Sequence, residues 1–99
     1  MAITITVNPS NGDITVDPTV AHFHPEAMVN WIVTSGTSLT ISFKNSSPFG
    51  AQLQFQGPGS VEQGIPLNSP KNVRYHYALT ATVGNTNYVI PGCPEIVIE

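Results

Sequence analysis

The chain has 99 residues, a formal net charge of −3, and 9% charged residues, against roughly 25% in an average globular protein. This length suits a single domain, residues 1–99, and does not accommodate two. The three cationic side chains, Lys44, Lys71 and Arg74, are too few and too scattered along the sequence to form a basic stripe. Because phosphate neutralisation supplies most nucleic-acid affinity, nucleic acid is not an expected partner.

The single cysteine, Cys93, cannot form an intramolecular disulfide, so a disulfide-stapled scaffold is excluded. No apolar run approaches the ~20 residues of a membrane-spanning helix. The first residues have neither the basic start nor the apolar core of a signal peptide. We therefore expect no membrane association and, by default, a cytoplasmic location.

Apolar and polar residues alternate with a period of two through most of the chain, and the expected helix content is close to zero. The first predicted strand covers residues 2–7. Strand patterns resume at residues 14–17 and 19–24, on either side of Pro18. Because proline has no N–H to donate, this element is expected to be an edge strand or to change sheets at Pro18.

The next two predicted strands cover residues 29–33 and 39–43, with turn residues between them, and we expect them to pair as a hairpin. Trp31 is the largest apolar side chain of the first. After a short strand at residues 52–56, we predict a long loop over residues 57–72. Structureless loops of that length are uncommon in small domains and are often functional.

The longest predicted strand covers residues 73–83, and shorter ones follow at residues 88–90 and 95–99. We expect Trp31, Phe43, Tyr75 and Leu79 to share one core. Short strands separated by frequent turn signals predict an all-β, two-sheet Greek-key sandwich of seven or eight strands.

Several segments, in this order along the chain, resemble the cupredoxin-like sandwich, whose architecture is also immunoglobulin-like. They are Ile14-Thr15-Val16-Asp17-Pro18, Val29-Asn30-Trp31, Thr40-Ile41-Ser42-Phe43, Tyr75-His76-Tyr77-Ala78-Leu79 and Pro94-Glu95-Ile96-Val97-Ile98. Cupredoxins with type 1 copper hold the metal with two His, one Cys and a weak axial Met. Cys93 stands before the last strand, as the family's cysteine does, but the residues after it include no His or Met. The resemblance therefore implies a copper-free relative without a cofactor.

His22 and His24 are the sharpest local feature. In an extended segment, residues two apart project from one face, so the two imidazoles could chelate copper or zinc. If Phe23 points inward, both are instead ordinary residues of the wet face. Further ligands would have to be brought in by folding, from Glu26, Met28, His76 or Cys93. His76 itself falls on the polar face of its strand, which predicts a solvated position.

No pattern indicates an enzyme. Cys93 has no cation or helix near it in the sequence to stabilise a thiolate, and it is interpreted as a small residue closing a turn. The chain has no Gly-x-Ser-x-Gly nucleophile motif. Its six acidic residues lie mostly in turns or near the end, which does not suggest a pair facing across a cleft.

We therefore expect a non-catalytic protein-interaction or structural module that presents residues 45–50 and 57–72 to a protein partner or to another copy of itself. A surface of low charge associates readily because little repulsion opposes contact. Two alternatives to this interaction module are the metal-binding protein described above and a carbohydrate-binding module. The latter would use an aromatic and amide surface made of Phe49, Phe55, Gln52, Gln54 and Gln56, although Phe55 also alternates correctly for the core.

Overall fold

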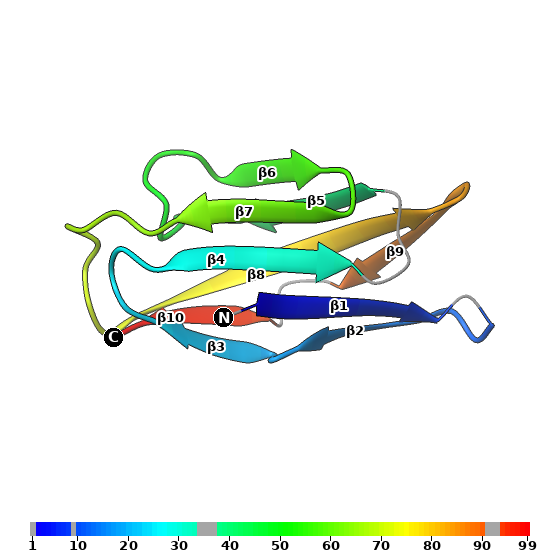
Figure 1. Ribbon diagram of the computed structural model, residues 1–99, viewed down its shortest axis with the longest axis horizontal. Helices are drawn as coiled ribbons and strands as arrows, with labels where there is room; N and C mark the ends of the chain where they lie inside the picture. The colour runs from blue at the N-terminus through cyan, green and yellow to red at the C-terminus, as the bar shows by residue number, and fades with distance from the viewer. Residues whose placement is uncertain (1, 9, 34–37, 91–93) are drawn as a thin grey trace.

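All regular structure in the computed structural model, which describes residues 2–8, 10–33, 38–90 and 94–99, is β-strand (Figure 1). The described residues form ten strands, more than the seven or eight expected. These are β1 (Ala2–Asn8), β2 (Asp13–Asp17), β3 (Val20–Phe23), β4 (Met28–Val33), β5 (Ser38–Phe43), β6 (Gln54–Gly57), β7 (Ser60–Gly64), β8 (Val73–Val83), β9 (Thr86–Ile90) and β10 (Glu95–Ile98). No helix in this part of the chain is long and apolar enough to cross a membrane.

The strands form two sheets that pack as a sandwich. The four-stranded sheet has the order β2-β1-β4-β7, and the six-stranded sheet has the order β3-β10-β8-β5-β6, with β9 also paired to β8. β1 runs parallel to β4 and β3 parallel to β10, while the other pairs are antiparallel. The predicted all-β, two-sheet architecture is confirmed.

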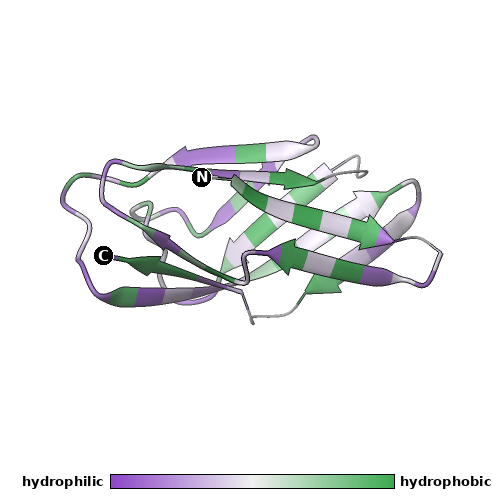
Figure 2. Ribbon diagram, turned by 60° about the horizontal axis from the view of Figure 1, so that its bottom comes forward, coloured by the Kyte–Doolittle hydropathy of each residue, from purple (hydrophilic) through white to green (hydrophobic). Residues whose placement is uncertain are grey.

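The core lies between the sheets and follows from the alternation in the sequence. Hydrophobic and hydrophilic residues alternate along most strands, so each strand turns one face inward (Figure 2). Trp31, Phe43, Tyr75 and Leu79 are all buried and belong to one cluster. The expectation that these four side chains share a core is confirmed.

The chain changes sheets at Pro18, as its missing N–H suggested. β2 is the edge of the four-stranded sheet and β3 is the edge of the six-stranded sheet, so both alternatives offered for this element hold together. The Asp17-Pro18 peptide bond is cis.

The predicted hairpin of residues 29–33 and 39–43 is wrong. β4 pairs with β1 and β7, whereas β5 pairs with β8 and β6 in the other sheet. Both strands bury alternate residues, and that pattern fits strands in facing sheets as well as neighbours in one sheet. Alternation therefore predicted which face of each strand is buried but not which strands pair with it.

The predicted loop at residues 57–72 is wrong in part, because β7 occupies Ser60–Gly64. Only Val61 of this strand is buried, so the sequence has almost no alternation there. The strand forms through backbone pairing with β4, with Val61 opposite Trp31. Gly59 lies between β6 and β7 at a φ of 77°, a conformation that glycine adopts readily.

Candidate functional site

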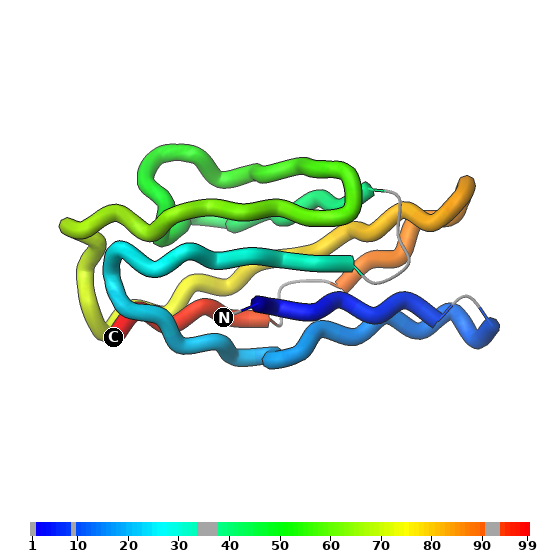
Figure 3. The backbone as a smooth tube through the Cα atoms, viewed as in Figure 1, coloured from blue at the N-terminus to red at the C-terminus, as the bar shows by residue number. Residues whose placement is uncertain are grey.

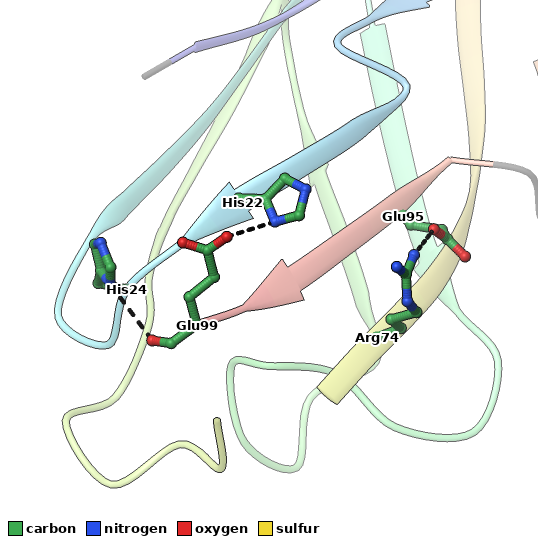
Figure 4. Close-up of polar contacts among 5 residues, drawn as sticks. All are labelled: His22, His24, Arg74, Glu95 and Glu99. Atoms are coloured by element: carbon green, nitrogen blue, oxygen red, sulfur yellow. Dashed lines mark hydrogen bonds and ion pairs between the residues drawn. The ribbon is translucent and has the colours of Figure 1, made fainter. Parts of the chain in front are cut away.

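His22 and His24 project from the outer face of the six-stranded sheet at its β3 edge, and Phe23 between them is buried. Both imidazoles meet the same residue of the neighbouring segment (Figure 4). His22 Nδ1 lies 2.7 Å from Glu99 Oε1, and His24 Nδ1 lies 3.4 Å from the main-chain oxygen of Glu99. Folding thus supplies Glu99, which the sequence did not suggest as a companion of this pair.

Within residues 2–8, 10–33, 38–90 and 94–99, no three or more His, Cys, Asp and Glu side chains are grouped so that they could hold a metal ion. Cys93, which the sequence predicts to close a turn, lies outside these residues. His76 lies on β8 with an exposed side chain, in agreement with the predicted solvated position.

A second polar group crosses from β8 to β10. Glu95 is opposite His76 in the strand register, and its side chain is 14% exposed. Glu95 Oε2 accepts a hydrogen bond from Arg74 Nη1 at 2.8 Å, and Glu95 Oε1 lies 3.1 Å from His76 Nε2. Figure 4 shows the Arg74 contact. One carboxylate therefore fixes two side chains at the start of β8.

A hollow of about 300 Å³ opens beside the start of β8, on the side of β5 rather than of β10. The antiparallel pairing with β5 ends at Phe43 opposite Tyr77, whereas β8 begins four residues earlier, at Val73. The first residues of β8 pair with β10 but have no β5 partner, so space remains there. Its lining consists of Lys44, Asn45, Ser46, Arg74, Tyr75 and His76.

Two loops, residues 44–53 and residues 65–72, lie at the end of the molecule where β8 begins, as the backbone trace in Figure 3 shows. Within the first, the buried Ser47 donates from Oγ to the Gln52 carbonyl at 2.7 Å and accepts from the Phe49 amide at 3.2 Å. Ser69 Oγ in the second donates to the Pro48 carbonyl at 3.0 Å. Side-chain hydrogen bonds thus order the first loop and join it to the second.

The expected aromatic surface does not form. Phe55 is buried, and Phe49 is partly buried, with its ring 5.3 Å from that of Phe55 and 5.8 Å from that of Trp31. Gln52, Gln54 and Gln56 are exposed, as predicted. The aromatic half of the surface on which the carbohydrate alternative depended is therefore part of the core.

The sequence matches no protein-family model and no curated protein. Among solved structures, the chain is similar to "Novel Purple Cupredoxin from Nitrosopumilus maritimus", with a TM-score of 0.52 and 16% sequence identity over 97% of this chain and 98% of that one. At this identity the likeness shows the fold and not the function. Two facing sheets of these strands and this structural neighbour agree with the resemblance in the sequence, and the chain has the cupredoxin-like fold.

Proposed function

We propose that the protein is a non-catalytic interaction module whose partner protein binds at one end of the sandwich. This loop end consists of residues 44–53, 65–72 and the first residues of β8, 73–76. The observation that carries the proposal is the placement of charge. The three Lys and Arg residues of the chain, Lys44, Lys71 and Arg74, all belong to the loop end.

The four-stranded sheet has the opposite character. Its strands carry Asp13, Asp17 and Glu62 and no Lys or Arg. In a chain with net charge −3, residues 44–53 and 65–76 thus contain three cations and no Asp or Glu, and Glu95 of β10 pairs with one of these cations, Arg74. Complementary charge steers association and selects against partners of the same sign, so the proposed partner has an acidic surface.

The loop end also combines a fixed backbone with an apolar contact. The hydrogen bonds of Ser47 and Ser69 hold the two loops before any partner arrives, which lowers the ordering cost of binding. Leu67 is 72% exposed in the second loop, beside polar residues. An exposed apolar side chain with a polar surround is the usual composition of a small interface.

A photo-crosslinking residue in place of Leu67, in cells of the source organism, tests the proposal. Met28 is the matched control, because it is also an exposed apolar residue, at 51%, but lies on the four-stranded sheet. We expect a discrete protein adduct from position 67 that disappears when Lys44→Glu and Arg74→Glu are combined with it. No adduct at position 67, or equal adducts from positions 67 and 28, would contradict the proposal.

Metal binding by His22 and His24 is the competing candidate, although these two imidazoles and Glu99 do not form a group that could hold a metal ion among the described residues. Titration of the purified protein with Cu(II) or Zn(II), followed by thermal unfolding, separates the two. A saturable rise in Tm that is lost in both His22→Ala and His24→Ala would favour the metal-binding alternative. An unchanged Tm at excess metal would remove it.

A further inference from the structure

We infer that the hollow between the end of β5 and the start of β8 is a binding site for a single carboxylate group, supplied by an acidic side chain of the partner. This inference rests on the proposed function, because it gives the chemistry by which the loop end recognises that partner. It assigns the contact to Lys44 and Arg74 rather than to the third cation, Lys71.

The size of the hollow suits a side chain better than a larger ligand. Its volume of about 300 Å³ is at the lower limit of small-molecule pockets, which span roughly 300–1,000 Å³. Lys44, Asn45 and Ser46 form the wall that follows β5, and Arg74, Tyr75 and His76 form the wall on β8. These residues carry an ammonium, an amide, a hydroxyl and a guanidinium, all of which donate hydrogen bonds.

Glu95 sets the charge of the site from the far side of β8. Its carboxylate receives one Arg74 N–H, out of the five that a guanidinium carries, and approaches the His76 ring. This contact limits the orientations of Arg74 without using all of its donors. It also neutralises one of the two positive charges of Lys44 and Arg74, so one positive charge of this pair remains in excess.

One excess positive charge is balanced by a monoanion. A carboxylate meets this condition at pH 7, whereas inorganic phosphate is there a mixture of monoanion and dianion, and the dianion would leave the site negative. None of the six residues that line the hollow is Asp or Glu, so the lining itself adds no negative charge. The site therefore favours a carboxylate over phosphate, and over a neutral amide of the same shape.

Backbone amide shifts in ¹⁵N-labelled protein can measure this preference. The probes are the peptide Ac-Gly-Glu-Gly-NH₂, its glutamine analogue Ac-Gly-Gln-Gly-NH₂, and inorganic phosphate, all at one low ionic strength held constant with chloride. We expect saturable shifts at residues 44–46 and 74–76 with the glutamate peptide, weaker binding of phosphate, and no saturable shift with the glutamine peptide.

Lys44→Met removes the charge while retaining most of the apolar stem of the side chain. One exposed ion pair is worth up to about 1 kcal/mol, so the affinity for the glutamate peptide should fall about fivefold. Lys71→Met is the matched control, and it should change the affinity by less than about twofold. Both side chains are exposed, so neither variant is expected to disturb the fold.

Three results would overturn the inference: no saturable shift with the glutamate peptide, phosphate binding at least as tightly, or equal losses in Lys44→Met and Lys71→Met. These failures are distinguishable from failure of the proposed function. If position 67 crosslinks its partner while the hollow does not bind the glutamate peptide, the interaction module stands and the carboxylate site falls. If the peptide binds but no adduct forms at position 67, the reverse holds.

Discussion

Replacing Tyr77 with Phe should make the protein more stable, although Tyr77 is one of the most buried side chains of the core. Its ring is 1% exposed and packs edge to face against Trp31, with ring centroids 5.8 Å apart. Neither Tyr77 Oη nor Trp31 Nε1 has a hydrogen-bond partner of ordinary geometry among the described residues, although the Trp31 N–H lies near enough to the phenol to lower its pKa. The hydroxyl has therefore lost its hydration without gaining a bond in exchange.

The size of the effect follows from that imbalance. A buried polar group without a partner costs about 1–3 kcal/mol. Removing the hydroxyl recovers part of this, while the missing oxygen leaves a small packing defect that opposes the gain. We expect the free energy of unfolding to rise by about 1 kcal/mol, which corresponds to an increase in Tm of roughly 4–8 °C for a domain of this size.

Alkaline pH provides an independent measurement. Burial raises the pKa of the Tyr77 phenol from 10.0 to about 12, and the nearby Trp31 indole offsets only part of this rise. Because the phenol has a higher pKa in the folded state than in the unfolded state, its ionisation favours unfolding: stability is unaffected by this ionisation below pH 10 and falls as the pH rises toward 12. At about 1.4 kcal/mol for each unit of pKa difference, the native protein should lose about 3 kcal/mol relative to Tyr77→Phe over this interval.

Urea unfolding measures both effects, with the fluorescence of Trp31, the one tryptophan of the chain, as the signal. Circular dichroism supplies a second probe, because Tyr77 lies against that indole. Tyr88→Phe is the control, since Tyr88 is only partly buried, and it should change stability by less than about 0.5 kcal/mol. A Tyr77→Phe variant less stable than the native protein at pH 7 would refute the reasoning, because the hydroxyl would then have a favourable interaction.

Three further substitutions test the fold and its polar contacts. Trp31→Ala should lower the free energy of unfolding by about 3–5 kcal/mol, measured by urea unfolding monitored by circular dichroism, and a loss below about 1 kcal/mol would mean that the core does not depend on this ring. Ser47→Ala should cost about 1–2 kcal/mol and speed hydrogen exchange of the Phe49 amide, whereas the exposed Ser42→Ala should do neither. Glu95→Gln should cost no more than about 1 kcal/mol, and the difference from the native protein should shrink in 1 M NaCl if ion pairing causes it.

The candidate site depends on contacts that no local pattern could indicate. Lys44 and Arg74 line one hollow because β5 and β8 pair antiparallel and β8 extends beyond the end of β5. Glu99 meets His22 and His24 because β10 runs parallel to β3. In both cases the residues are distant in the sequence, and their approach follows from strand order and register.

The sequence by itself determined which residues face inward. Period-two alternation predicted the all-β class, the shared core of Trp31, Phe43, Tyr75 and Leu79, and the outward positions of His22 and His24, because side chains of a strand project to opposite faces in turn. The change of sheet at Pro18 was equally local, since a missing N–H limits pairing wherever proline occurs.

Only the tertiary structure decided which strands are neighbours. The same alternation serves a hairpin or two facing sheets, so the separation of β4 from β5 could not be predicted from their residues. β7 has almost no alternation and owes its formation to backbone hydrogen bonding with β4. Burial patterns specify a face, whereas pairing depends on backbone groups that every residue but proline carries alike, so partners and registers emerge from the whole fold.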